Sequence, residues 1–313
     1  MPLPISHLAA VLQSGQFAVA AELSPPKGVD LASIARDAQT LRAYADAVNI
    51  TDNQAASVRM ASIPVAALLL RHGVEPVAQM TCRDRNRLAI QADLLGAAAL
   101  GIRNLLCLSG DHGIWGDHPE AKNVYDVDSM HLIRMARNLC EHGILDNGRP
   151  VSPAPQFFIG AAANPFAPPL DYRPLRLGKK VAAGARFVQT QLIYNVARFK
   201  TYMTRVADLG LHEQVYILAG VGPVKSAGQA SFMATKVAGM EVPDEIVQRM
   251  TKTPKAAQPE EGIRICNEII EQVRQIPGVA GIHIMAVHWA DAVPEIVTRA
   301  GLYPRPSRSI SQE

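Results

Sequence analysis

The chain has 313 residues, of which 48% are hydrophobic, and its 31 basic and 28 acidic residues leave a formal net charge of +3. No basic stripe with interleaved aromatic residues occurs, so the composition gives no support for nucleic-acid binding. The longest apolar runs, such as PVAALLL at 64–70, are well below the roughly 18 residues that a membrane span needs. The first residues lack the pattern of a signal peptide, so we expect a cytoplasmic protein without a membrane partner.

Short apolar runs alternate with longer segments of helical period along the whole chain. Eight of these runs predict β-strands, at 19–24, 47–51, 76–81, 104–108, 156–161, 187–191, 215–219 and 281–287. Helices are predicted between them, most clearly at 31–45, 86–101, 172–184 and 259–275.

This alternation predicts an α/β protein with a (β/α)8 TIM barrel. A doubly wound sheet is the rival architecture, but neither GxGxxG nor GxxxxGK[ST] occurs, and eight evenly spread strands favour barrel closure. No linker divides the chain, so we expect one domain over residues 1–304, followed by a surface tail at 305–313. Two long connections, 109–154 and 220–280, begin at the carboxyl ends of strands, where barrel enzymes place their sites.

Polar side chains gather at the ends of the predicted strands, which converge on one mouth of a barrel. The set is Glu22, Thr51, Asp52, Asn53, Thr81, Ser109, Asp111, Asn164, Gln191 and His288. It pairs carboxylates with amides and hydroxyls, and it contains no lysine placed for a Schiff base and no obvious nucleophile. His112, His118 and His131 lack the HExxH spacing, and the four cysteines form no CxxC pair, so we expect no metal site. The pattern favours a neutral or cationic organic substrate, with proton transfer available.

Glu22 has the most unusual position of this set. In AAELSPPKG, at 20–28, the acid ends an apolar strand and is followed closely by two prolines. Because proline cannot continue a strand ladder or enter a helix interior, the pair predicts a stiff exit that holds the acid at the rim.

Several segments together resemble the methylenetetrahydrofolate reductase family over roughly residues 17–303. They are AELSPPKG (21–28), VNITD (48–52), AQMTCRDRN (78–86), LGIRNLLCLSGD (100–111), KKVAAGARFVQTQ (179–191), GMEVPDEI (239–246) and GIHIMAV (281–287).

The resemblance implies a flavin-bearing barrel that interconverts 5,10-methylenetetrahydrofolate and 5-methyltetrahydrofolate. It implies FAD as the cofactor, NADH or NADPH as the electron donor, and either a homo-oligomer or a partner electron-transfer subunit. By the same resemblance, Glu22 is the general acid, Asp111 is a catalytic and substrate-binding acid between flavin and pterin, and Gln191 contacts the pterin. The implied cofactor-binding residues are Thr51, Ser109, Gly110, Asn164 and Lys180.

The sequence departs from the family pattern mainly around the flavin. Gln79 replaces a histidine, Ser109 an arginine, Asn164 a tyrosine, Arg173 a carboxylate and His288 an asparagine. These changes leave three interpretations open: a divergent flavin site, a site completed by a partner subunit, and a flavin-free enzyme in which a nicotinamide delivers hydride directly. A pterin-binding module that passes a methyl group to a corrinoid partner is a further alternative.

Overall fold

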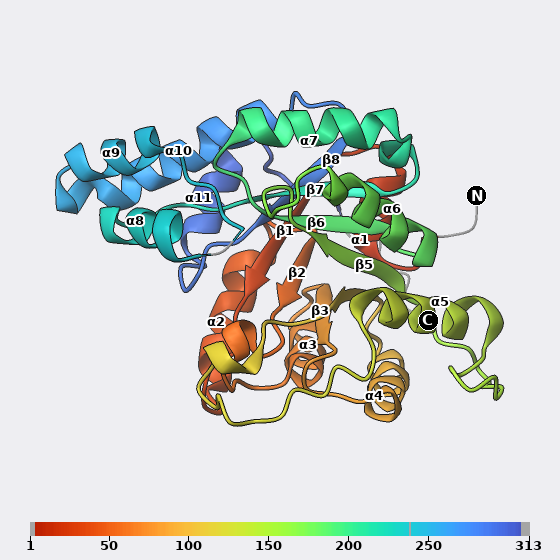
Figure 1. The fold of residues 1–313 in the computed structure, drawn as a ribbon. Coiled ribbons are helices and arrows are strands. Elements are labelled where there is room, and N and C mark those ends of the chain that lie inside the picture. The colour runs from red at the N-terminus through yellow and green to blue at the C-terminus, as the bar shows by residue number, and fades with distance from the viewer. Residues whose placement is uncertain (1–3, 238, 308–313) are drawn as a thin grey trace.

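Eight parallel strands close into a barrel in which each strand pairs with its neighbours in the sequence and β8 pairs with β1. The structure is a computed structural model that describes residues 4–237 and 239–307. The strands are β1 (Ala18–Leu23), β2 (Ala47–Ile50), β3 (Pro76–Thr81), β4 (Asn104–Leu108), β5 (Phe158–Ala163), β6 (Phe187–Leu192), β7 (Tyr216–Val221) and β8 (Val279–Ile284). The predicted (β/α)8 barrel is confirmed (Figure 1).

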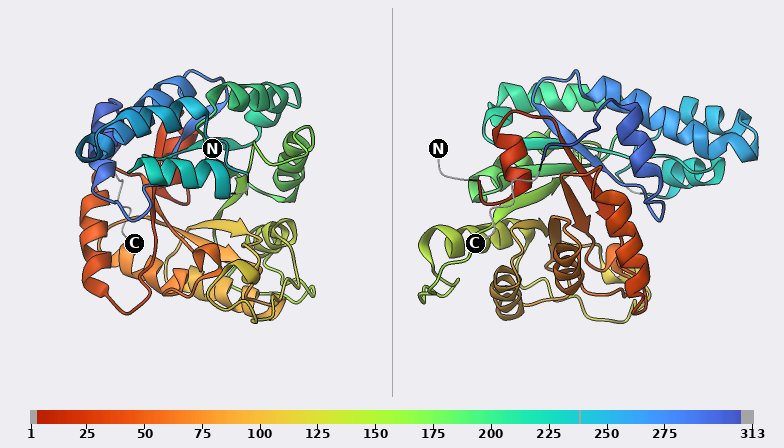
Figure 2. Two further views of the ribbon diagram at one scale, coloured as in Figure 1. Left: turned by 60° about the vertical axis from the view of Figure 1, so that its left-hand side comes forward. Right: turned by 180° about the vertical axis from the view of Figure 1, so that it is seen from behind.

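Helices surround this barrel on all sides in the views of Figures 1 and 2. They are α1 (His7–Gln13), α2 (Leu31–Leu41), α3 (Ser62–Arg71), α4 (Arg87–Ala99), α5 (Ser129–His142), α6 (Tyr172–Ala183), α7 (Val196–Asp208), α8 (Ala227–Lys236), α9 (Asp244–Lys252), α10 (Gln258–Val273) and α11 (Ala292–Arg299). Short 3-10 turns occur at Gln54–Ala56, Gly113–Trp115, Leu211–Glu213 and Lys255–Ala257. No helix in the described ranges is long and apolar enough to cross a membrane.

Most predicted boundaries lie within a few residues of the observed ones, and the largest difference for a strand is at β8. Its pairing with β1 ends at Ile284, opposite Ala21, whereas the apolar run that predicted the strand continues to Val287. The long connection between β7 and β8 carries α8, α9 and α10, and α8 and α9 project from the barrel at the left of Figure 1.

The half of the barrel interior near the amino ends of the strands is filled by apolar side chains. Phe158 and Phe187 stack there with ring centroids 5.0 Å apart. Gly160 leaves room for this pair, because a Cβ at that position would lie 2.2 Å from the Phe187 ring. Helix α1 closes this end with Leu8 and other buried side chains. The carboxyl ends of the strands therefore hold the open mouth.

Arg305 joins the predicted tail to the barrel. Its guanidinium donates hydrogen bonds to the Asp46 carboxylate at 2.6 and 3.2 Å and to the carbonyl of Phe17 at 2.8 Å. Asp46 is fully buried and also accepts a hydrogen bond from the Val19 N–H. The start of the tail thus packs against the barrel, whereas residues 308–313 lie outside the described residues.

Candidate active site

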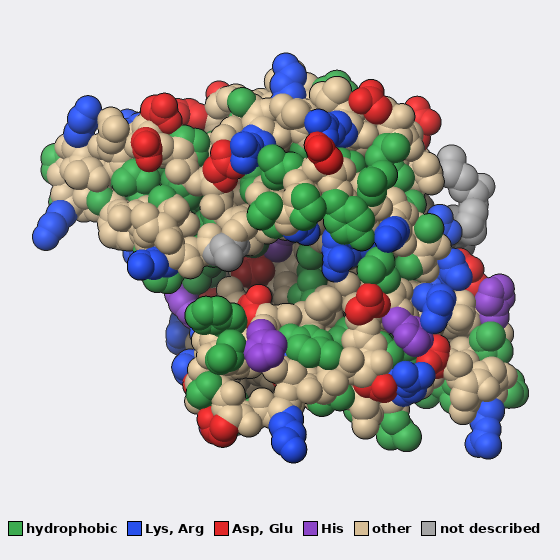
Figure 3. Space-filling view, in the orientation of Figure 1, with side chains coloured by type: hydrophobic (Ala, Val, Ile, Leu, Met, Phe, Trp, Pro, Cys, Tyr) green, Lys and Arg blue, Asp and Glu red, His purple; other side chains and the backbone are tan. Residues whose placement is uncertain are grey.

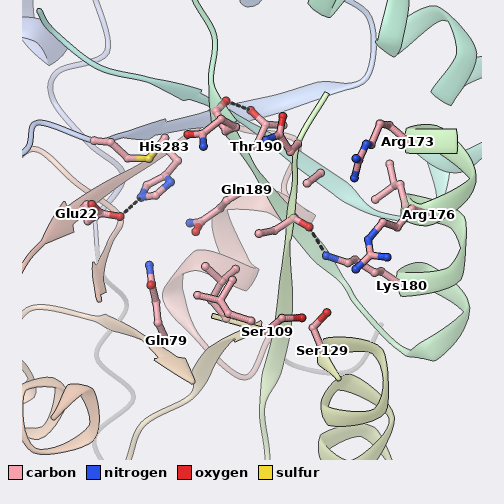
Figure 4. Close-up of a pocket in the computed structure, with 18 residues that line it drawn as sticks. Glu22, Gln79, Ser109, Ser129, Arg173, Arg176, Lys180, Gln189, Thr190 and His283 are labelled. Carbon is pink, nitrogen blue, oxygen red and sulfur yellow. Dashed lines mark hydrogen bonds and ion pairs between the residues drawn. The ribbon is translucent and has the colours of Figure 1, made fainter. Parts of the chain in front are cut away.

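A cavity of about 340 Å³ lies in the half of the barrel near the carboxyl ends of the strands (Figure 4). The space-filling view in Figure 3 shows that the face of the molecule is hollowed near its centre. Residues of β1, β3, β4, β5, β6 and β8 line the cavity, together with α6 and Ser129 of α5. Its polar lining consists of Glu22, Gln79, Ser109, Ser129, Asn164, Arg173, Arg176, Lys180, Gln189, Thr190, Gln191 and His283.

Glu22 is the acid of this cavity. It is the penultimate residue of β1, and its side chain is only 9% exposed. Burial raises the pKa of its carboxyl to about 7, and a hydrogen bond from Gln79 offsets part of that rise. A substantial fraction of Glu22 is therefore protonated at neutral pH, as a general acid requires.

His283 of β8 lies beside Glu22. Its Nε2 is 3.8 Å from Glu22 Oε2, the contact marked by a dashed line in Figure 4. Burial lowers the pKa of His283 to about 3, so the imidazole is neutral at pH 7 and the contact is not an ion pair there. This Nε2 finds no hydrogen-bond partner within the described part of the chain.

Helix α6 supplies a basic wall to the cavity. Lys180 donates a 2.5 Å hydrogen bond from Nζ to the carbonyl of Ala162, and burial, followed by the nearby charge of Arg176, lowers its pKa to about 8. Arg176 follows Arg173 by three residues and Lys180 follows Arg176 by four, so all three side chains share one helix face. Such a wall suits an anionic group on a ligand.

The family model described as methylenetetrahydrofolate reductase matches residues 7–301, nearly the whole chain. The chain belongs to the methylenetetrahydrofolate reductase family. The resemblance inferred from the sequence motifs is thereby confirmed.

Curated relatives in this family are longer proteins. The chain is 27% identical over 287 residues to methylenetetrahydrofolate reductase 2 of Schizosaccharomyces pombe, an alignment that covers 85% of this chain and 42% of the relative. It is 25% identical over 249 residues to a probable methylenetetrahydrofolate reductase (NADPH) of Caenorhabditis elegans, covering 77% of this chain and 35% of the relative. The chain thus spans less than half the length of these reductases.

Solved structures show the same fold at low sequence identity. A protein from Clostridium thermocellum, described as binding two copies of 5-methyl-5,6,7,8-tetrahydrofolic acid, has a TM-score of 0.66 at 12% identity, covering 95% of this chain and 100% of its own. EDTA monooxygenase from Chelativorans sp. BNC1 has a TM-score of 0.56 at 10% identity, covering 94% and 96%. At these identities the likeness establishes the barrel fold and no more.

Five residues predicted from the family resemblance line the 340 Å³ cavity. Glu22, Ser109, Asn164, Lys180 and Gln191 approach it from β1, the end of β4, the end of β5, α6 and β6. The Gln191 side chain already makes one hydrogen bond within the protein, because its Oε1 accepts from the N–H of Leu192 at 2.9 Å. Their assigned roles remain predictions, although the barrel brings them together.

Seven other predicted residues lie outside the cavity lining: Thr51, Asp52, Asn53, Thr81, Gly110, Asp111 and His288. Thr81 donates hydrogen bonds from its backbone N–H and its hydroxyl to the Asp52 carboxylate, both at 2.9 Å, and the Asn53 amide donates to Asp84. Asp111 is exposed on the loop after β4, and its carbonyl oxygen accepts a hydrogen bond from Arg83. Thr51 is buried, and its hydroxyl has no partner among residues 4–237 and 239–307. Gly110 has a φ of +87°, a conformation that favours glycine. The exposed His288 lines a second cavity, of about 530 Å³, which also reaches Glu22.

Five polar residues of the cavity lining were missed at the level of sequence: Ser129, Arg176, Gln189, Thr190 and His283. Gln189 follows a period-2 pattern, because it precedes Gln191 by two residues and inward-facing residues alternate along a strand. Arg176 follows Arg173 by one helical turn.

Within the described residues, no group of three or more His, Cys, Asp or Glu side chains is placed to hold a metal ion.

Proposed function

We propose that this protein is an oxidoreductase that interconverts 5,10-methylenetetrahydrofolate and 5-methyltetrahydrofolate, with Glu22 as the general acid. The observation that carries this proposal is the buried carboxyl in the barrel mouth, with its pKa of about 7. Family membership supports the same reaction class.

Reduction of the folate needs one proton and one hydride. The bridging methylene becomes reactive only when its five-membered ring opens, and the departing nitrogen must then receive a proton. A glutamate in water, with a pKa near 4.5, would be ionised at neutral pH. Burial of Glu22 keeps the proton available, so the carboxyl can protonate the departing nitrogen and leave an iminium carbon that accepts the hydride.

We assign Asp111 an electrostatic role in the same step. Its carboxylate would favour the cationic iminium over the neutral ring. Because the side chain is exposed outside the cavity lining, this role requires the loop after β4 to bring Asp111 over the mouth when folate binds. The same requirement applies to its proposed contact with the pterin.

The residues of the α6 wall fit the phosphates of FAD, the cofactor that the family implies. Lysine and arginine side chains bind phosphates well, and Ser109 and Asn164 add a hydroxyl and an amide to the cavity that Lys180, Arg173 and Arg176 also line. When bound, the flavin would supply the hydride. Thr51 and Gly110 are assigned to the same cofactor, and the electron donor would be NADH or NADPH.

A flavin-free reductase is the second candidate. The three basic side chains of α6 would serve the phosphates of a dinucleotide such as NADPH equally well, since phosphate oxygens accept the same hydrogen bonds in either molecule. In that case the nicotinamide would supply the hydride directly, and Glu22 would keep its role as the acid.

The test is an absorbance spectrum of the purified protein, followed by turnover of methylenetetrahydrofolate with NADH and NADPH. We expect visible flavin bands that bleach on addition of the donor and return on addition of methylenetetrahydrofolate. A colourless preparation with full activity would establish the flavin-free route. Protein that is folded and saturated with FAD but inactive with both donors would overturn the proposed reaction.

A further inference from the structure

Gln189 is a buried amide on the wall of the cavity. It lies on β6, its side chain is part of the cavity lining, and the residue is only 2% exposed. Neither its Nε2 nor its Oε1 has a hydrogen-bond partner among the described residues. A buried amide of this kind lowers the stability of the folded chain unless a bound water or ligand forms hydrogen bonds with it.

The fold provides partners for a buried glutamine elsewhere. Gln258 accepts a hydrogen bond from the N–H of Ala227 at 3.1 Å, and it donates to the carbonyls of Met250 and Thr253 at 3.2 and 3.1 Å. Gln189 differs because it faces the cavity. In Figure 4 its amide end points toward Glu22 and His283.

The two free hydrogen-bonding atoms of the Gln189 amide indicate which chemical group of a ligand would bind there. A side-chain amide presents one donor and one acceptor in a plane, so its complement is a planar ring edge with a carbonyl beside an N–H. The pterin ring of folate has such an edge, formed by its 4-oxo group and N3–H. We propose that Gln189 binds this edge and selects the pterin ring for the site, an inference that rests on the proposed folate reaction.

The position of Glu22 favours the pterin over other rings. Nicotinamide and flavin also carry amide edges, but neither carries the methylene bridge whose opening needs a proton. The pterin carbonyl lies next to N5, one of the two nitrogens that hold the methylene group. A ring held at this edge by Gln189 therefore keeps its reacting end close to the wall that carries Glu22.

The test compares Gln189→Leu with Gln258→Leu, the same change at a buried glutamine that has partners. We expect Gln189→Leu to weaken binding of 5-methyltetrahydrofolate about tenfold or more, and binding of 6-methyltetrahydropterin by the same factor, in isothermal titration calorimetry. Its Tm should rise, because leucine removes two unpartnered polar atoms from the interior. Gln258→Leu should lower the Tm and leave both affinities unchanged.

Gln189→Glu provides a second variant of nearly the same shape. Its carboxylate has no N–H to donate to the ring carbonyl, so both affinities should fall here as well. Wild-type affinity for the pterin in Gln189→Leu and Gln189→Glu would overturn the assignment, as would weaker binding of FAD or NADPH with folate binding unchanged. If the wild-type protein binds neither folate nor the pterin, the proposed reaction itself fails, which is a different result.

Discussion

His283 Nε2 lies 3.8 Å from Glu22 Oε2 in a part of the barrel where both side chains are less than one tenth exposed. Burial shifts the two groups in opposite directions on the pH scale: it raises the pKa of the acid to about 7 and lowers that of the imidazole to about 3. Near neutral pH the pair is therefore a neutral histidine beside a carboxyl that can hold a proton. This is the arrangement that a proton donor needs.

Glu22→Gln should reduce the rate of methylenetetrahydrofolate reduction by about 10²-fold or more, because the amide has no acidic proton to give. For the wild-type enzyme, kcat/KM should fall as the pH rises above about 7, since the deprotonated carboxylate cannot act as the acid. Steady-state kinetics from pH 5.5 to 9 would check both effects. A variant with wild-type turnover would show that Glu22 is not the acid.

The same substitution should change the pH dependence of stability. The Glu22 pKa is raised in the folded state, so its protonated form stabilises the fold below pH 4.5, and that contribution is lost as the pH rises through about 7. The shift corresponds to roughly 3 kcal/mol. Urea unfolding at pH 5 and pH 8 should show a smaller difference between the two pH values for Glu22→Gln than for wild type.

Gln79→Leu should raise the pKa of Glu22 further, because it removes the hydrogen bond that stabilises the carboxylate. The descending limb of the kcat/KM profile would then move to higher pH, with the maximal rate retained if the amide serves only Glu22. An unchanged limb would mean that Gln79 does not act on the acid in the working enzyme.

Lys180→Met should weaken binding of FAD or NADPH, whichever the wild-type protein binds, by about tenfold or more. Wild-type affinity should also fall above pH 8, where Lys180 loses its proton. Lys179→Met is the matched control, since that lysine is exposed and pairs with Tyr172 instead. Equal effects of the two variants in fluorescence titrations would argue against a specific contact with Lys180.

Asp111→Asn should slow reoxidation of the reduced cofactor by methylenetetrahydrofolate more than reduction of the cofactor by NADPH, because the carboxylate acts on the folate cation. The Tm should stay within experimental error, as the side chain is exposed. Stopped-flow rates with the opposite order would contradict the proposed role.

Arg305→Ala should destabilise the protein by roughly 3 kcal/mol, because it leaves the buried Asp46 carboxylate without its main charged partner. Burial raises the pKa of Asp46, but hydrogen bonds with His7 and Arg305 outweigh it and keep this pKa below its ordinary value. The stabilisation is therefore present at neutral pH and lost as the pH falls through the lowered pKa, so the two proteins should converge in acid. Arg299→Ala, which breaks surface ion pairs with Glu260 and Glu295, should change stability little.

Much of this protein could be predicted from local patterns. Strand length, the period of apolar residues and the absence of a dinucleotide fingerprint were enough to predict the barrel, because each of these is a property of a short segment. Glu22 was evident for the same reason, as an acid between an apolar strand and two prolines. The positions of Gln191, Lys180, Ser109 and Asn164 around one cavity followed from barrel geometry and family resemblance together.

Only the tertiary structure decided which polar side chains meet and which have no partner. The raised pKa of Glu22 depends on burial by strands far apart in the sequence, as does the neutrality of His283. The unpartnered amide of Gln189 and the exposure of Asp111 likewise depend on where whole strands and loops are placed. Sequence patterns record the type and spacing of residues, whereas solvation and hydrogen bonding depend on neighbours that only barrel closure brings together.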